Sequence, residues 1–522
     1  MADVSDRVNA MLQERARQQH HLQWTEFVNQ YAVNLLFPAN VVSKDSKKKI
    51  KSNKDLINAR LLENGILFED LQNLPQLQSG VAKVVENLVR TGCFQSVQLE
   101  VDKAKEGTSE YPHQLNVILD EKNWYSLYVG GGFKHEGIGD ESGMMNMNGA
   151  KFPKAQFETS ATLLNLTGYL DQSILRYTVD QTSTSTLLLS HERPLYSWLG
   201  DETPLGAYLL ALPEGSQYSL GIRANLDTLD YDWTRSYKEY QRCLTCRVDN
   251  TGRVQRTEMA PGYYWGLDWT LTQRDVVPRK HPTLPYAADA SQEIVALSGT
   301  SLTHSLTWEV RTNGDYCDSR FQPSMGWDAY SKIQVAGPPG DVGFAKAQGG
   351  VAVHIPVFGK RLAVHGSCSG GVLQDLSYNG LCISPPTISD RFFVGGPMQL
   401  RGFLPAGIGP RSKSGGSTSP GGDALGGSLY YTATVAASVA PGGLLADYGV
   451  RLFSFANAGT LVGKHEGIPM KTILNSTRTA VGAGISAATP MGRLEATYAW
   501  PLRYGPRDVR RNLQFGFGFH FG

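Results

Sequence analysis

From Trp124 to the C-terminus, apolar and polar residues alternate along the chain with a period of two. The segments 124–134, 155–163, 429–439 and 493–500 each place apolar residues at every second position, with polar or small residues between them. Segment 514–521 does the same and puts four phenylalanines on one face. Because successive side chains of a strand point to opposite faces, each segment predicts a strand with one apolar face. Strands of about ten residues joined by Gly, Pro and Asp turns are typical of a transmembrane β-barrel.

A large soluble β-sandwich or a β-propeller would show a similar alternation. Three features favour the membrane barrel. The polar face carries ionisable residues and glycines, as a wet lumen would. The last strand ends on phenylalanine rather than on a polar cap, and no blade-length repeat is apparent. We therefore predict a mainly β protein whose residues 123–522 form an antiparallel transmembrane β-barrel.

The N-terminal part has a different pattern. Residues 1–43 are polar with helical spacing, so we predict a helical N-terminal extension that breaks at Pro38. The segment 44–54 is basic and is expected to be a solvated linker, with contact to anionic lipid head groups as the alternative. Residues 55–122 predict a small α/β module. Its helix at 77–88 stops at Gly92, and its strands lie at 94–101 and 114–119.

Composition narrows the function. The net charge is +1, which indicates no polyanionic partner and no nucleic acid. No apolar run approaches the roughly 18 residues of a membrane-spanning helix. The start, MADVSDRVNAMLQERARQQHH, lacks the apolar core of a secretory signal, so we expect no export through a signal-peptide pathway.

The sequence carries no recognisable catalytic motif. Cys243 and Cys246 form a lone CxxC motif without a second ligand pair, which we interpret as a loop with two free thiols. We find no nucleophile elbow and no phosphate-binding loop. We therefore predict no cofactor, no metal and no enzymatic activity.

The segment 390–403, DRFFVGGPMQLRGF, interrupts the strand pattern. Gly395, Gly396 and Pro397 force a turn, because glycine tolerates positive φ and proline fixes its own. Arg401, Gly402 and Phe403 follow that turn, and an arginine on a glycine-flanked tip can enter a confined space. We expect a functional loop here.

At these residues the chain resembles the BamA superfamily of outer-membrane assembly and secretion barrels, and within it the mitochondrial sorting-and-assembly-machinery core barrels. The similarity continues through 421–424 (GGDA), 450–461 (VRLFSFANAGTL) and 482–502. Segment 87–102, NLVRTGCFQSVQLEVD, is similar to the end of a POTRA (polypeptide-transport-associated) domain. The resemblance implies a POTRA domain with its basic linker at 44–122 and a barrel of about sixteen strands. Residues 201–338 show no recognisable family motif and are expected to carry long inserts, whose role stays open.

The resemblance also implies a lateral gate between a first strand at 124–134 and a last strand at 513–521. The gate residues of the first strand are Leu127, Val129, Gly130, Gly131 and Gly132. Glycines remove cross-strand side-chain pairs and would weaken this seam, although tight barrel packing explains them almost as well. The last strand resembles the β-signal of barrel precursors, through Gln514, Gly516, Phe517 and Phe519.

In the family the loop motif folds into the lumen, held by its arginine. Many relatives place an aspartate opposite it, where this chain has Asn457, near Gly459. Glu495, expected one strand later and on the polar face, is a second candidate acceptor for Arg401. If Asn457 points inward, strict alternation sends Phe453 and Phe455 inward too, unless a bulge intervenes.

The function that the resemblance implies is a β-barrel insertase of the mitochondrial outer membrane. It would bind precursor β-signals at the gate and release folded barrels into the lipid. Its implied partners are precursor β-barrel proteins, membrane lipid and accessory subunits on the cytosolic face, with the POTRA domain in the intermembrane space. The alternative is a polypeptide-conducting or solute pore of the same superfamily, and a plastid-envelope location stays open.

Overall fold

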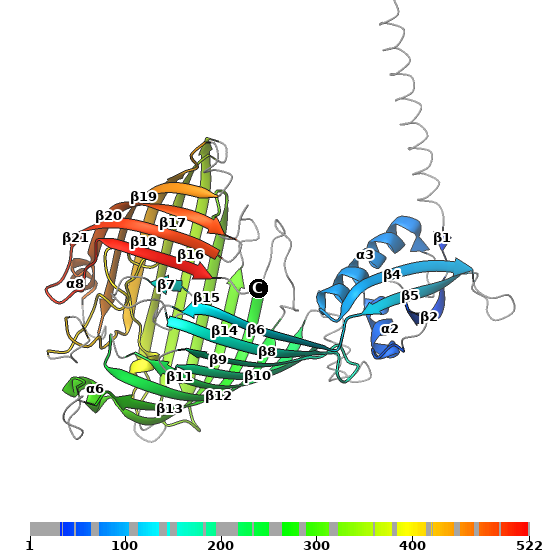
Figure 1. The fold of residues 1–522 in the computed structure, drawn as a ribbon, viewed down its shortest axis with the longest axis horizontal. Helices are drawn as coiled ribbons and strands as arrows, with labels where there is room; N and C mark the ends of the chain where they lie inside the picture. Colours follow the sequence, from blue (N-terminus) through cyan, green and yellow to red (C-terminus); the bar gives the residue numbers. More distant parts are fainter. Residues whose placement is uncertain are drawn as a thin grey trace, which may run out of the picture.

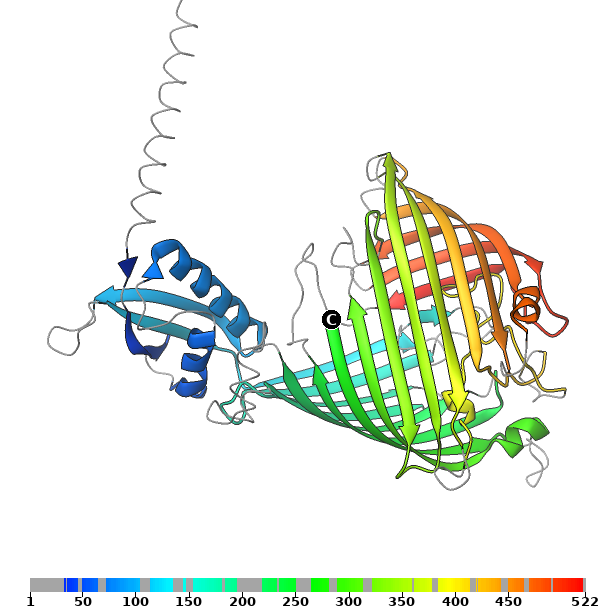
Figure 2. The same ribbon diagram turned by 180° about the vertical axis from the view of Figure 1, so that it is seen from behind.

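The structure is a computed structural model. It describes residues 32–33, 35–45, 49–63, 72–103, 113–134, 144–146, 154–180, 184–194, 218–231, 234–249, 264–280, 289–312, 322–358, 361–377, 384–413, 419, 421–442, 449–463, 469–489 and 492–519. No helix in these ranges is both long enough and apolar enough to cross a membrane. Figures 1 and 2 show a small N-terminal module lying beyond one end of a large β-barrel.

The module is a three-stranded sheet with two helices. Its sheet has the order β2 (Leu35–Ser43), β5 (His113–Glu121), β4 (Phe94–Lys103), and its helices are α2 (Lys54–Glu63) and α3 (Leu74–Arg90). Two short strands, β1 (Ala32–Val33) and β3 (Gln72–Asn73), pair separately. Alternate residues of β5, Leu115, Val117 and Leu119, are fully buried against Val84 and Leu88 of α3. Gly92 ends α3 with a φ of +73°.

The expected helical extension at 1–43 is wrong for its last part, because 35–43 form β2, parallel to β5. Pro38 does not break a helix; it lies in this edge strand, where the register shifts between Leu36 and Asn40. Proline is tolerated at an edge or a bulge because its missing N–H leaves no ladder bond unmade. Residues 1–31 lie outside the described ranges.

The barrel sheet contains all strands from β6 onward, and neighbouring strands pair antiparallel. They are β6 (Tyr125–Lys134), β7 (Met144–Asn146), β8 (Lys154–Leu164), β9 (Gln172–Asp180), β10 (Ser185–Pro194), β11 (Ser219–Asp230), β12 (Tyr237–Asp249), β13 (Tyr264–Pro278), β14 (Gly299–Thr312), β15 (Gly326–Gly337), β16 (Phe344–Phe358), β17 (Leu362–Asp375), β18 (Leu429–Val439), β19 (Val450–Val462), β20 (Arg478–Thr489), β21 (Gly492–Arg503) and β22 (Leu513–Phe519). Short helices α6 (Gln292–Ala296), η2 (Ile388–Asp390) and α8 (Met470–Asn475) lie between strands. Without the three-residue β7, sixteen described strands form the wall, which confirms the expected barrel.

The alternation of the sequence sorts side chains between the two faces of the wall. On β21 the inward Glu495 and Thr497 are 3% and 1% exposed, whereas the outward Tyr498 and Trp500 are 44% and 51% exposed. Outward apolar side chains of this kind suit contact with lipid, and the polar inner face suits a lumen.

The middle region, in which no family motif could be recognised from the sequence, also belongs to the barrel. Residues 219–337 contain β11 to β15. Cys243 and Cys246 lie on β12, so their interpretation as a loop is wrong. Residues three apart on a strand point to opposite faces, which explains why these two free thiols cannot share one metal.

The turn between β8 and β9 is docked into the module. Leu170 is fully buried in the module core, although its φ is +60°. The Asn53 N–H donates to the Gly168 carbonyl oxygen at 2.8 Å, and the Asn165 amide donates to Ser52 Oγ at 2.8 Å. Burial raises the pKa of the Asp171 carboxyl, but hydrogen bonds from the Thr167 hydroxyl and N–H outweigh it and lower that pKa below its ordinary value. The second and third long strands of the barrel are thereby fixed to the module.

Candidate functional site

The loop between β17 and β18 forms a compact turn inside the barrel. Gly395 and Gly396 have φ of +137° and +100°. A Cβ on Gly395 would clash with the Leu404 carbonyl oxygen, so this position requires glycine. The Gly396 N–H donates to the Phe403 carbonyl oxygen at 2.9 Å and closes the turn. Phe403 is fully buried, which places the tip of the loop in a packed environment.

Arg401 at this tip forms an ion pair with Glu495 of β21. Its Nε lies 2.6 Å from Glu495 Oε1, and the side chains are 10% and 0% exposed. Arg493 Nη2 approaches the other carboxylate oxygen at 3.0 Å. A buried carboxylate between two guanidinium groups is a strong, directional acceptor. Of the two candidates from the sequence, Glu495 therefore receives the guanidinium.

Asn457 contacts the same residue at another atom. Its amide nitrogen donates to the Arg401 carbonyl oxygen at 3.3 Å. Phe453 and Phe455 point inward with it, and β19 keeps an unbroken register on both sides, so no bulge intervenes. The Arg401 guanidinium lies 5.4 and 5.0 Å from the centres of these two rings, within cation–π range. At Gly459, a Cβ would come within 3.1 Å of Leu400, so the missing side chain lets the loop approach β19.

Gln514 of β22 also holds the tip, a contact that the sequence did not reveal. This side chain is fully buried. Its Oε1 accepts from the Gly402 N–H at 2.9 Å, and its Nε2 donates to the Phe403 carbonyl oxygen at 2.7 Å. Two residues on, Gly516 faces the same loop, since its Cβ would lie 3.3 Å from Pro397. The polar and glycine positions of the β-signal pattern therefore contact the loop motif.

The barrel seam lies where β22 meets the N-terminal strands. On one edge, β22 pairs with β21, placing Phe517 opposite Leu494 and Phe519 opposite Gly492. On its other edge, Gly516 to Gly518 pair with β7. In the strand order β6 follows β22, but within the described ranges its residue-by-residue register is with β8 alone.

The first strand β6 is open on both faces. The outward Leu127 and Val129 are 72% and 68% exposed, and Tyr128 on the opposite face is 56% exposed. The Tyr128 ring lies over Gly130 on that face. Gly131 and Gly132 pair with Phe157 and Gln156 of β8. No loop packs against the described inner face of β6 in the way that the motif packs against β22.

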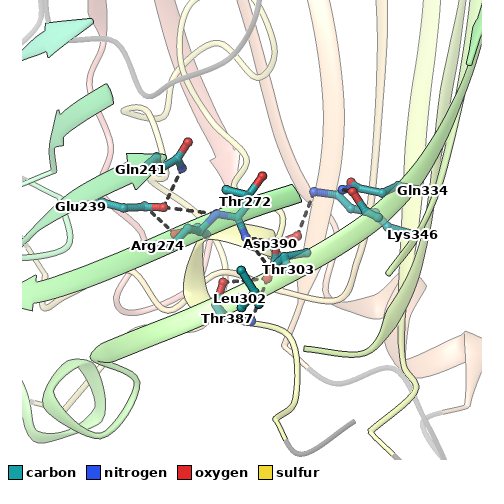
Figure 3. A network of polar contacts seen from close by, with 12 residues as sticks. Glu239, Gln241, Thr272, Arg274, Leu302, Thr303, Gln334, Lys346, Thr387 and Asp390 are labelled. Atoms are coloured by element: carbon teal, nitrogen blue, oxygen red, sulfur yellow. Dashed lines mark hydrogen bonds and ion pairs between the residues drawn. The ribbon is translucent and has the colours of Figure 1, made fainter. Parts of the chain in front are cut away.

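A second polar network fixes the start of the loop to the opposite wall (Figure 3). Asp390 Oδ1 accepts from Arg274 of β13 at 2.6 Å, and its carbonyl oxygen accepts from Lys346 of β16 at 2.8 Å. Arg274 also lies 3.5 Å from Glu239 of β12, which accepts from Ser389 at 2.5 Å. Asp390 and Glu239 are 3% and 0% exposed. The loop is thus anchored at both ends, and it crosses the lumen between the anchors.

The sequence pattern indicated the loop and its arginine but not this network. Asp390 is the first residue of the motif, and Arg274 occupies an inward position of a strand. An arginine on the inward face of a strand is rarely buried without a partner, so it signals a paired acceptor. That signal identifies Arg274 as a candidate, but not its partner.

Comparisons with known proteins agree with this architecture. The Omp85 superfamily domain matches residues 165–521. A SAM50-like protein of Schizosaccharomyces pombe is 30% identical over 241 residues, which cover 44% of this chain and 47%, about half, of that protein. Sorting and assembly machinery component 50 homolog B of Xenopus laevis is 25% identical over 511 residues, covering 92% of this chain and 94% of that protein. The solved structure of BamA from Haemophilus ducreyi lacking POTRA domains 1–3 has a TM-score of 0.66 at 16% identity, covering 94% and 85% of the two chains.

Proposed function

The chain belongs to the Omp85 superfamily, and from this premise we propose that it inserts precursor β-barrel proteins into the mitochondrial outer membrane. The relatives that align over most of the chain are described as sorting and assembly machinery components, and the Xenopus laevis protein aligns with 92% of the chain. A bacterial relative is described as an outer membrane protein assembly factor. These names describe assembly factors rather than enzymes, which supports a function without covalent chemistry.

The observation that carries the proposal is the exposure and one-sided pairing of β6. Its side chains are exposed on both faces, and among the described residues its register is with β8 only. A strand edge without a partner exposes N–H and C=O groups that lipid cannot satisfy. An incoming strand can satisfy them by β-augmentation. The proposed gate is therefore the β6 edge, with Leu127, Val129 and Gly130 to Gly132 forming the template.

The precursor's β-signal would pair with the edge of β6 that is not in register with β8. In this chain that pattern is Gln514, Gly516, Phe517 and Phe519. The folded product would then leave sideways into the lipid, because closure of its own seam removes the edge that held it.

We further propose that the N-terminal module is a POTRA domain in the intermembrane space. The similarity in fold to a BamA structure over 94% of the chain supports this assignment. The opposite end of the barrel would face the cytosol and meet accessory subunits there.

Site-directed disulfide cross-linking tests the proposal. The native cysteines are replaced, and a single cysteine is placed at Leu127 or Val129. A barrel precursor carries one cysteine in its β-signal. We expect cross-links that follow a strand register and disappear when the signal glycine and apolar residues of the precursor are replaced.

Two control positions separate insertion from conduction. Val351 on β16 faces outward with a similar exposure of 51%, so a cysteine there reports random contact with the precursor. Tyr128 reports the inner face of the same strand. Cross-links at Tyr128 alone that ignore the β-signal would identify a chain in transit through a pore, and the insertase proposal would then be abandoned.

A further inference from the structure

A groove lies at the end of the last hairpin, on the side of the barrel opposite the module. It has a volume of about 560 Å³ and is called the rim groove here. Its lining residues are Gly421, Trp500, Pro501, Tyr504, Pro506, Arg507, Asp508, Val509, Arg510 and Asn512. Most of them belong to the connection between β21 and β22, which borders the seam.

The rim groove is strongly basic, although the chain as a whole carries a net charge of only +1. Residues 503–511 contain Arg503, at the end of β21, and Arg507, Arg510 and Arg511 in the connection, all exposed, with one acidic residue among them. That acid, Asp508, is already engaged by Arg478 at 2.9 and 3.3 Å. Within the described ranges none of the four exposed arginines has a carboxylate partner. Four uncompensated cations in one short segment are an anion-binding feature.

Two of these arginines are held over the groove. The Arg510 guanidinium lies 3.8 Å from the centre of the Tyr504 ring. Arg507 Nη1 donates to the carbonyl oxygens of Arg411 and Ser412 at 3.4 and 3.3 Å. A guanidinium has five N–H donors, so both side chains keep donors for a ligand. Their stacking and hydrogen bonds reduce the entropy lost when a ligand binds.

The other side of the groove is apolar and continuous with the lipid-facing wall. Trp500 lines the groove and is 51% exposed on the outer face of β21. Leu502 and Leu513 beside it are 63% and 48% exposed. Aromatic side chains at the end of a transmembrane strand mark the level of the lipid head groups. A ligand that fits both sides has an anionic head and an apolar tail.

We propose that the rim groove binds one anionic phospholipid, with its phosphate on Arg507 and Arg510 and an acyl chain along Trp500 and Leu513. An acidic protein segment would match the arginines but not the apolar wall beside them. Arginine binds phosphate through paired N–H donors. The uncompensated positive charge of the segment favours a head group with a net negative charge over a zwitterionic one, whose ammonium group the arginines would repel.

The lipid would act on the same elements that hold the loop motif. The Leu404 N–H donates to the Val509 carbonyl oxygen at 2.9 Å, and the Val509 N–H donates to Gly407 at 2.8 Å. The Arg511 N–H donates to the Gly402 carbonyl oxygen at 3.0 Å. The floor of the groove is therefore tied to the loop tip, and a bound lipid would stiffen the last hairpin.

Native mass spectrometry of the full chain, purified and stripped of lipid in detergent, tests the proposal. Phosphatidylglycerol and phosphatidylcholine with identical acyl chains are the probes. The variants are R507Q/R510Q, R507K/R510K and the control K471Q, which removes an exposed cation of α8 on the same face. We expect selective retention of phosphatidylglycerol, a loss of about tenfold or more in R507Q/R510Q, an intermediate loss in R507K/R510K and none in K471Q.

Three results would overturn the proposal. Equal retention of the two lipids would show that the charge is not recognised, and equal loss in K471Q would show general surface attraction. Displacement of the lipid by a glutamate-rich peptide or by inorganic phosphate would assign the groove to a protein segment or a free anion. If R507Q/R510Q unfolds, the R507K/R510K variant and the competition experiment with the parent chain decide the question.

Discussion

The two edges of the seam are held by different parts of the molecule. On the C-terminal side, Gln514 of β22 is fully buried and bonded to the loop tip, and Glu495 of β21 is paired with Arg401. On the N-terminal side, β6 is exposed on both faces and lacks contact with the loop in the part of the chain that the structure describes. Its neighbours β8 and β9 are instead fixed to the module through Leu170.

This difference would allow a stable barrel to open along one line, as the proposed gate requires. The loop motif joins β19, β21 and β22 to Arg274 on the far wall, so the C-terminal edge belongs to the packed interior. The N-terminal edge belongs to a unit made of β6, β8, β9 and the module. If the seam parts as proposed, we expect the second unit to move and the first to stay, because β6 has exposed side chains on both faces, whereas Glu495 and Gln514 on β21 and β22 are buried and paired.

The largest expected effect comes from the Arg401 pair. In R401A, Glu495 keeps only Arg493 as a partner in a fully buried position, and we expect a loss of about 3–5 kcal/mol of stability and of insertion activity. Thermal unfolding in detergent and a precursor insertion assay measure both. R176A is the matched control, since Arg176 forms an exposed pair with Glu158 at 3.3 Å and should cost at most about 1 kcal/mol. Equal losses in the two variants would refute the idea that the loop stiffens the C-terminal edge.

Leu170 tests the other side of the comparison. L170A removes a fully buried side chain from the module core and should cost about 2–5 kcal/mol of docking stability. Hydrogen exchange should rise in the β8–β9 turn and in β5, while β21 and β22 keep their protection. L166A is the control, because Leu166 lies in the same turn but is 55% exposed. Increased exchange in β22 would show that the two units are not separate.

A substitution at Gln514 tests whether its buried hydrogen bonds to the loop stabilise the C-terminal edge. Q514M keeps the size of the side chain but leaves the Gly402 N–H and the Phe403 carbonyl without partners, at about 1–3 kcal/mol. Q334M, which removes one half-buried bond to Ser305 at 3.3 Å, should cost less. Unfolding temperatures of the two variants make the comparison. If Q514M is as stable as the parent chain, the buried bonds to the loop do not hold this edge.

The fold was predictable because strand periodicity is a local property. Alternation at 429–439 and 493–500 indicated both the strands and their inward faces, as Glu495 and Thr497 confirm. The strand at 35–43 was missed because a proline and a bulge hide the period of an edge strand, and its pairing with β5 comes from a segment far along the chain. Such long-range pairing leaves no mark in a local window.

The site was predictable only in part, for the same physical reason. Glycines with positive φ and a nearby arginine are local signals, and they indicated the loop at 390–403. The partners of that loop come from β12, β13, β16, β19, β21 and β22, and each is an ordinary polar residue on an inward face. Barrel closure decides which of them meet. The burial of Leu170 could not be predicted either. An apolar residue in a short turn is expected to be exposed, and the sequence does not show that the module packs against this turn.

The smallest expected effect comes from one glycine substitution on each edge of the seam, which compares the two edges directly. In G516A the new methyl group would lie 3.3 Å from the Pro397 ring, which the loop holds in place, so we expect a loss of about 1 kcal/mol. In G130A it would meet only the far end of the Tyr128 side chain, which can rotate away. Replacing glycine within a strand also restricts the unfolded chain, so G130A should be neutral or about 0.5 kcal/mol more stable. Equilibrium unfolding of both variants in the same detergent measures the difference, and an equal change in both would mean that the loop does not distinguish the two edges.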